Sequence, residues 1–174
     1  MINVRHNIEP YVGLGPLRLG MMPDEVAKFD NVFGAVQRQD FQSLTNTTNE
    51  IRTHYSPFCV YKNNQLWVID TNLISRPFDL FLDQLDLYGM EPQDTLKALE
   101  IKNGGALANF AFVMFDKLGL VLRDFYKIHN KTYSTNEADR QICVYSRDAI
   151  SEITRVDPKY EHLPYIKFET VSFR

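Results

Sequence analysis

Histidine and cysteine, the side chains that most often act as metal ligands or nucleophiles, are few and scattered in this chain. No two histidines stand at i, i+4, and no two cysteines are close in sequence. Zinc sites need clustered nitrogen or sulfur ligands, so we expect no metal site. A cysteine nucleophile needs an activating histidine nearby in space; His54 close to Cys59 leaves that alternative open, but both cysteines lie in apolar, strand-like segments typical of buried, reduced thiols. The six residues are His6, His54, His129, His162, Cys59 and Cys143.

The glycine-rich stretch Gly13-Leu-Gly15-Pro16 differs from a phosphate-binding loop. It lacks the following Gly-Lys-Ser/Thr, and Pro16 removes an N–H group that such a loop would use. No Gly-x-Ser-x-Gly sequence, typical of a serine nucleophile, is present. The sequence therefore predicts no catalytic residues and no cofactor.

The least even distribution of charge in the chain is a run of acidic residues between Arg76 and Lys97. If 77–86 is a helix, Asp79, Asp83 and Asp86 share its outer face at i, i+4 and i+7. Like charges at this spacing destabilise a helix, so a partner that neutralises them is one interpretation. A solvated helix face is the other. No Lys or Arg interrupts the run, which consists of Asp79, Asp83, Asp86, Glu91 and Asp94.

Tyrosine and tryptophan are the aromatic types that most often anchor protein interfaces. Most of those in this chain are expected in the core or in half-buried sheet positions. Tyr126 and Tyr133 lie in a polar segment and are predicted to be exposed. With the acidic residues they form the predicted partner-binding set: Asp79, Asp83, Asp86, Glu91, Tyr126 and Tyr133.

A sequence repeat indicates which elements must position these residues. Gly-Met-x-Pro occurs at Gly20–Pro23 and again at Gly89–Pro92, each time followed by an acidic residue and apolar positions at helical spacing. Pro suits the first position of a helix, and the positive end of the helix dipole stabilises an acidic side chain in the first turn. Glycines at 34 and at 104–105 suit the helix ends. A predicted hairpin follows each helix, at 58–69 and at 110–122.

The remaining segments carry weaker patterns. The spacing of Phe78, Phe81, Leu82 and Leu85 favours a short helix over 77–86, whereas the repeat favours an extended segment there. Further expectations are an irregular or extended segment at 1–12, a polar loop at 37–50, a short strand at 51–55, a polar loop at 126–140, a third hairpin from 141–145 and 150–154, and a last strand at 165–173.

Composition excludes several classes of protein. A chain of 174 residues with 44% hydrophobic content can bury a core. A formal net charge of −3 argues against nucleic-acid binding through bulk electrostatics. No apolar run is long enough to span a membrane, and the N-terminus lacks the apolar region of a signal peptide. We therefore expect a cytoplasmic protein that binds neither nucleic acid nor membrane.

The patterns predict an α+β fold in which two helix–hairpin units form antiparallel sheet packed against helices. The expected single domain has two similar halves, about 11–75 and 76–125, followed by a C-terminal β segment, 126–174. The oligomeric state is left open.

The stretch Gly15-Pro-Leu-Arg-Leu-Gly-Met-Met-Pro-Asp-Glu-Val26 resembles the opening of small bacterial immunity proteins that neutralise polymorphic toxins, including toxins delivered by contact-dependent and type VI secretion systems. More distantly, the duplicated helix followed by antiparallel strands is similar to the plan of the β-lactamase inhibitor protein and of small outer-membrane assembly lipoproteins. In those families Ser or Thr usually follows Gly-Met and caps the helix. Here Met22 and Glu91 take that place, so the side-chain cap is expected to be missing.

The resemblance implies a protein that binds a cognate toxin or effector domain and blocks its active site. Such a role needs shape and affinity, and it fits a chain without a catalytic motif. Acidic groups facing a basic toxin surface would speed association. Two alternatives remain: a chaperone-like or structural component of a secretion system, and a small enzyme whose acids or histidines converge only in three dimensions.

Overall fold

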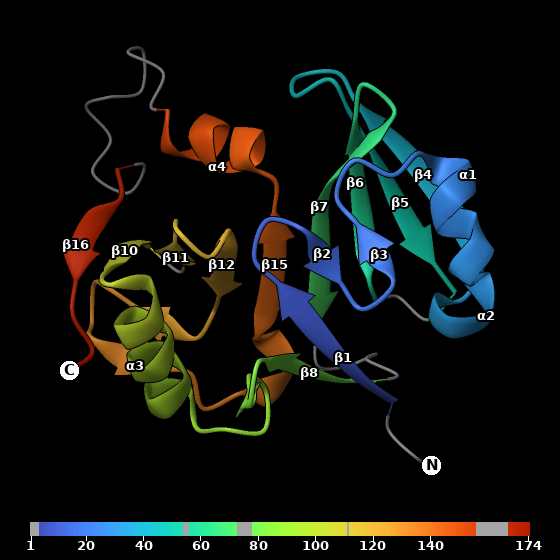
Figure 1. Cartoon of the computed structure of the whole chain (residues 1–174). Coiled ribbons are helices and arrows are strands. Elements are labelled where there is room, and N and C mark those ends of the chain that lie inside the picture. Colours follow the sequence, from blue (N-terminus) through green and yellow to red (C-terminus); the bar gives the residue numbers. More distant parts are fainter. Residues whose placement is uncertain (1–3, 54–55, 73–77, 111, 156–166) are drawn as a thin grey trace.

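The computed structural model describes residues 4–53, 56–72, 78–110, 112–155 and 167–174 and has an α+β fold (Figure 1). A nine-stranded sheet has the order β16-β10-β11-β12-β15-β7-β6-β5-β4, and all its pairings are antiparallel. Its strands are β4 (Val36–Gln42), β5 (Thr47–Arg52), β6 (Phe58–Lys62), β7 (Gln65–Asn72), β10 (Ala106–Asn109), β11 (Phe112–Phe115), β12 (Leu120–Arg123), β15 (Gln141–Tyr145) and β16 (Glu169–Val171).

Two runs of four antiparallel strands make up most of this sheet. The first run is β4 to β7, and the second is β10, β11, β12 and β15. The last strands of the two runs, β7 and β15, pair with each other, with Asp70 opposite Cys143 and Val68 opposite Tyr145. The two runs therefore form one continuous sheet, and the β7–β15 junction between them lies at its centre.

A smaller sheet covers one face of the large one (Figure 1). Its order is β3-β2-β1-β8-β9, with β1 and β8 parallel. These strands are β1 (Val4–Glu9), β2 (Gly13–Leu14), β3 (Leu17–Arg18), β8 (Phe78–Leu82) and β9 (Leu85–Asp86). A separate ribbon pairs β13 (Tyr126–Lys127) with β14 (Thr132–Tyr133).

Both helices that the repeat predicts are present, and Figure 1 shows them toward opposite ends of the large sheet. The first consists of α1 (Pro23–Val26), a 3₁₀ turn η1 (Ala27–Phe29) and α2 (Asp30–Phe33), and the second is α3 (Pro92–Asn103). Proline is the first residue of each, and neither Met22 nor Glu91 makes a side-chain cap hydrogen bond. The first helix ends before Gly34, with φ of 80°, and the second before Gly104, with φ of 82°. Glycine adopts such angles without strain.

One apolar cluster fills the space between the two sheets and the helices. It includes Leu14 and Leu80 of the small sheet, Phe33 and Leu96 of the helices, and Ile69 of the large sheet, all at most 1% exposed. A second cluster lies on the opposite face of the large sheet, under α4 (Arg147–Thr154). We call that opposite face the outer face and define it by Val60, Trp67, Val68, Asp70, Cys143 and Tyr145.

A buried ion-pair network fastens the first helix to the large sheet. The Arg52 side chain has no solvent exposure, and its guanidinium donates to Asp30 Oδ1 at 2.6 Å, to Glu50 Oε1 at 2.7 Å and to the Gly34 carbonyl at 2.8 Å. Glu50 is 1% exposed and also accepts from the Tyr61 hydroxyl at 3.3 Å. The Arg52 cation is fully removed from water, so it depends on these partners. The network therefore holds α2 and the following Gly34 against β5.

Two predicted elements of the second half are wrong. Residues 78–82 and 85–86 form strands, not a helix, because the alternating residues Phe78, Leu80 and Leu82 are buried between the two sheets. The extended segment that the repeat indicated is the one observed. Residues 147–154 form α4 in place of the second arm of a hairpin, because Ser146 caps them: its Oγ accepts from the Ala149 amide at 3.2 Å.

The predicted polar loops are also wrong. Residues 37–50 mostly belong to β4, an edge strand with exposed polar side chains, and to β5, where Thr47 and Glu50 are buried. The 126–140 segment contains β13, β14 and the 3₁₀ turn η2 (Glu137–Asp139). The 58–69 and 110–122 hairpins are confirmed in β6–β7 and β11–β12, with Asn63 and Asn64 at positive φ in the first turn. Only 169–171 of the predicted last strand is a strand, and residues 54–55, 77 and 165–166 lie outside the described residues.

Candidate functional site

A β-bulge aims the only tryptophan of the chain out of the large sheet. Val60 pairs with Val68 and Tyr61 pairs with Leu66, so Trp67 has no partner on β6 and is the extra residue of the bulge. As a result, Trp67 and its neighbour Val68 both pack with the outer cluster, whereas Leu66 and Ile69 face the main core. Bulges that redirect side chains are frequent beside functional sites. Trp67 therefore becomes the centre of the candidate site.

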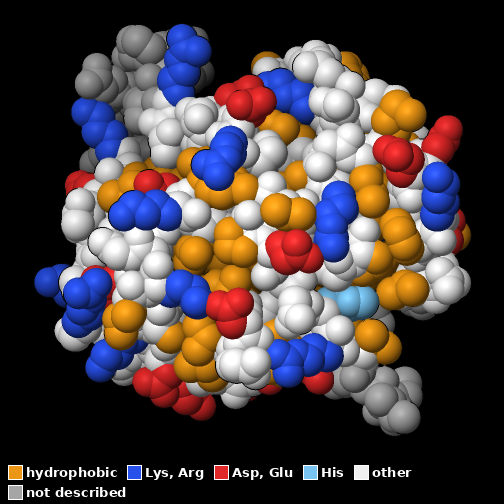
Figure 2. All heavy atoms as spheres, in the orientation of Figure 1, with side chains coloured by type: hydrophobic (Ala, Val, Ile, Leu, Met, Phe, Trp, Pro, Cys, Tyr) orange, Lys and Arg blue, Asp and Glu red, His pale blue; other side chains and the backbone are white. Residues whose placement is uncertain are grey.

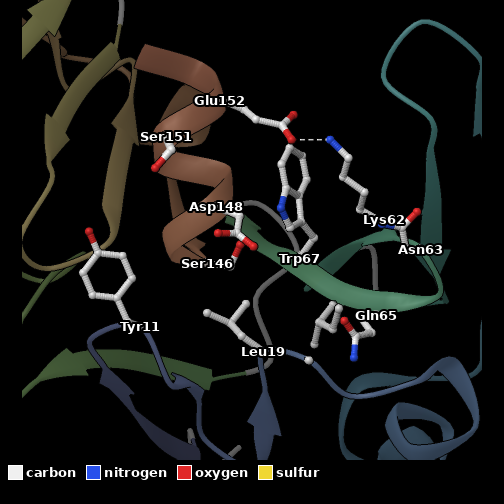
Figure 3. Close-up of a pocket in the computed structure, with 12 residues that line it drawn as sticks. Tyr11, Leu19, Lys62, Asn63, Gln65, Trp67, Ser146, Asp148, Ser151 and Glu152 are labelled. Atoms are coloured by element: carbon white, nitrogen blue, oxygen red, sulfur yellow. Dashed lines mark hydrogen bonds and ion pairs between the residues drawn. The ribbon is translucent and has the colours of Figure 1, made fainter. Parts of the chain in front are cut away.

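Trp67 stands between two hollows. The first, of about 600 Å³, is polar and lies between β7, the start of α4 and the β2–β3 segment (Figure 3). The figure shows Asp148 and Ser146 at the start of α4 turned toward the indole, with Tyr11 across the hollow. Lys62 bridges the top: its ammonium lies 4.7 Å from the Trp67 ring centroid and forms an ion pair with Glu152.

The second hollow, of about 390 Å³, lies on the outer face at the β7–β15 junction. Asp70, Cys143 and Tyr145 form part of its floor, and Trp67 is one wall. Leu44, on the turn between β4 and β5, also lines it and is fully exposed. The site thus combines a half-buried indole, a mostly apolar floor that contains the Asp70 carboxyl, and a charged border.

Asp70 is the unusual group in this floor. Burial raises the pKa of its carboxyl to about 6, although a hydrogen bond with the Cys143 thiol and the charge of Arg123 act to lower it. The same burial raises the pKa of Cys143 and of Tyr145 well above their ordinary values. Burial makes the ionised form of Asp70 unfavourable in the free protein. A partner that brings a hydrogen-bond donor or a cation to this carboxylate would stabilise the ionised form.

Asp70→Asn is expected to make the protein more stable at neutral pH. The pKa of Asp70 is higher in the folded chain than in the unfolded chain, so the ionised carboxylate destabilises the fold as pH rises from about 4 to 6. A shift from 3.8 to about 6 corresponds to about 3 kcal/mol, which residual solvent contact reduces to about 2 kcal/mol. Urea unfolding should show this gain at pH 7.5 and almost none at pH 4. An equal gain at both pH values would contradict the assignment.

Both cysteines and His6 occupy buried, structural positions. Burial raises the pKa of Cys59 to about 12, so its thiol stays protonated at neutral pH; both cysteines are buried and free, as predicted. His6 is buried between Phe33 and Phe78, and His129 stacks on Phe110. His54 and His162 lie outside the described residues. Within the described part of the chain, no group of His, Cys, Asp or Glu residues could hold a metal ion.

Three of the predicted acidic residues lie close together on a hairpin, and not on the predicted helix. Asp79 lies on β8, Asp86 on β9 opposite Phe81, and Asp83 in the turn between the strands, so a hairpin collects them instead of a helix. Cations from distant segments meet them: Arg5 lies opposite Asp79 with its guanidinium over the Phe81 ring and donates to the Asp83 carbonyl, and Lys102 pairs with the Asp83 carboxylate at 2.5 Å. Glu91 and Asp94 are exposed at the start of α3.

The two predicted aromatic anchors are not exposed. Tyr126 and Tyr133 are half-buried, pair with each other across β13 and β14, and both pack on Phe173 near the C-terminus. The correction has a physical reason: Phe173 supplies an apolar surface that no local pattern around the tyrosines shows. These rings hold the β13–β14 ribbon against the core, whereas the Trp67 ring lies beside two hollows. A role for the two tyrosines in partner binding stays a prediction.

Sequence reasoning missed both Trp67 and Asp70 as site residues. Trp67 reads as an ordinary strand residue, because a bulge leaves no mark in a hairpin sequence. Asp70 offered a faint signal, as it directly follows the apolar run Leu66–Ile69. The second half of the signal, its pairing with Cys143, depends on a contact between distant strands.

Comparison of the chain with family models, with curated proteins and with solved structures finds no match. Among the described helices, none has the length and apolar character needed to cross a membrane.

Proposed function

We propose that this protein is an inhibitor of the immunity type, which binds a cognate bacterial toxin domain through the outer face around Trp67 and blocks the active site of that toxin. The observation that carries the proposal is the bulge that turns Trp67 outward beside the hollow at the β7–β15 junction. The resemblance of residues 15–26 to immunity proteins supplies the class of partner.

The composition of the outer face supports protein binding. Interface hot spots combine an aromatic anchor with a surrounding border that excludes water. Trp67 supplies the anchor, Val60 and Tyr145 supply half-buried apolar area, and the Lys62–Glu152 ion pair lies on the border. A toxin side chain that enters the floor and donates to Asp70 would also remove the cost of its ionisation.

The charge distribution favours a partner with a basic surface. Asp148 and Glu152 line the polar hollow with Lys62 as the cation among its lining residues, and Lys62 already pairs with Glu152. Figure 2 shows the other side of the molecule, where the small sheet lies and Lys, Arg, Asp and Glu side chains are interspersed with apolar ones. The two acids and one lysine of the hollow carry a net negative charge, which complements a basic surface on the partner.

A pull-down tests the proposal directly. The tagged protein is expressed in its native bacterium and recovered, and co-eluting proteins in near-stoichiometric amounts are identified by mass spectrometry. We expect one partner with a toxin domain whose cell killing is relieved when this chain is co-expressed. Recovery of secretion machinery alone would favour a structural component, and turnover of a small substrate by the purified chain would favour an enzyme.

Changing Asp79, Asp83 and Asp86 together to Lys is expected to weaken toxin binding about tenfold or more at low salt, because the acidic hairpin would then repel a basic partner during association. Arg5 and Lys102 already neutralise part of this surface, so the effect should lie in the association rate and shrink when salt screens it. Stopped-flow association measured at two salt concentrations checks this.

The control for that experiment carries the same change in net charge elsewhere. Glu137, Asp139 and Glu169 are exposed on η2 and β16, and their replacement by Lys should leave the association rate within about twofold of the original. Equal losses in the two triple variants would show that the acidic hairpin, which lies on the small sheet and not on the outer face, acts only through net charge.

A further inference from the structure

We propose that two copies of this chain associate edge to edge, with β4 of one copy pairing antiparallel to β4 of the other about a two-fold axis at Gln39. This inference goes beyond the proposed function, since it concerns a second copy of the chain and not the toxin. It would join the two nine-stranded sheets into one.

The first observation is that β4 ends the sheet with one side unpaired among the described strands. It has seven residues, pairs with β5, and contains no proline. Six of the seven are exposed, and Asp40 is half-buried. An edge strand presents unpaired backbone N–H and C=O groups, which are the groups a further strand binds.

The second observation is that the charges of β4 complement themselves in one register. Arg38 and Asp40 flank Gln39, and they form an ion pair within the strand, with Arg38 Nε donating to Asp40 Oδ2 at 2.7 Å. Antiparallel pairing about Gln39 places each Arg38 opposite Asp40 of the second copy. Pairing about Asp40 would place two carboxylates opposite each other, and pairing about Arg38 two guanidinium groups. Opposite charges across strands stabilise a pair and like charges destabilise it, so the two-fold at Gln39 is selected.

The third observation is apolar exposure beside this register. Phe41 on β4 is 65% exposed, Val36 is 38% exposed, and Leu44 on the adjoining turn is fully exposed. Pairing about Gln39 brings each Phe41 opposite Gln37 of the second copy and covers part of the ring. The register irregularity between Val36 and Arg38 confines regular pairing to the middle of the strand, so the dimer should be weak and reversible.

Sedimentation velocity over a range from about 10 µM to about 1 mM, the range of weak interfaces, measures the self-association. The probe is the full chain alone. We expect a reversible shift from monomer to dimer and, in hydrogen exchange at the higher concentration, added protection of the β4 amides. A chain that stays monomeric across the range overturns the proposal.

Charge reversal then tests the register. R38D places two acids opposite each other on both sides of the axis, and D40R places two arginines there, so each single variant should weaken dimerisation by about tenfold or more. The double variant R38D/D40R restores both attractions. A mixture of the two single variants should form a heterodimer, since each acid then faces an arginine.

The thermal midpoints of the same variants show whether each one is still folded. An exposed ion pair contributes little to stability, so the thermal midpoint of each single variant should remain close to that of the original chain. Single variants that dimerise as strongly as the original chain, or a double variant and a mixture that both remain monomeric, would overturn the Gln39 register.

Discussion

Replacing Arg52 with Met is expected to lower the free energy of unfolding by about 3–5 kcal/mol, the range found when one partner of a buried ion pair is removed. The Arg52 guanidinium is fully buried and satisfies Asp30, Glu50 and the Gly34 carbonyl. Methionine fills a similar volume but offers no donor. Glu50, which is 1% exposed, would keep only its contacts with Tyr61 and Gln39.

The measurement is urea unfolding followed by circular dichroism at neutral pH. As the matched control we choose the double variant in which Glu50 is also replaced, by Leu. Removing both charges should recover a large part of the loss, because no buried charge then remains without its partner in β5. A loss below about 1 kcal/mol for Arg52→Met would place this network among weak surface pairs and contradict its structural role.

Trp67→Ala is expected to weaken toxin binding by about 2–4 kcal/mol, which is about 30-fold to 1,000-fold in the dissociation constant. The bulge turns the indole toward the border of both hollows, and truncation removes the largest apolar contact a partner could make there. Isothermal titration calorimetry with the purified toxin domain measures the change.

Two controls separate binding from folding. Trp67→Phe keeps an aromatic ring on the bulge and should retain affinity to within about tenfold. Tyr133→Ala removes a ring that packs on Phe173, so it should lower the thermal midpoint and leave the dissociation constant nearly unchanged. If Tyr133→Ala weakened binding more than Trp67→Ala did, the β13–β14 ribbon would replace the outer face as the proposed toxin-binding surface.

The sequence predicted the helix ends and the tight turn, because each depends on residues that are neighbours in the chain. Pro23 and Pro92 mark the two helix starts, and the glycines after each helix mark the ends, because both effects act within one turn. The Asn63-Asn64 turn was predictable for the same reason. For residues 77–86 the repeat predicted the structure better than helical spacing did. The strand buries alternate residues between the two sheets, and some of these residues also fall at helical spacing.

The site depended on contacts between distant segments. Asp70 becomes costly to ionise because folding buries it beside β15, and the Cys143 thiol on that strand offsets only part of the cost. Trp67 turns outward because β6 and β7 differ by one residue in their register, which neither strand reveals alone. Part of the charge on the predicted acidic face is neutralised for a similar reason, since Lys102 of α3 pairs with the Asp83 carboxylate in the fold.

Hydrogen–deuterium exchange of this chain with and without its co-purified toxin domain tests the central claim most directly. The account predicts that toxin binding slows exchange in β7, β15 and α4, the elements around Trp67. Slowed exchange confined to β8, β9 and the start of α3, with β7 and α4 unchanged, would contradict it and move the interface to the acidic hairpin.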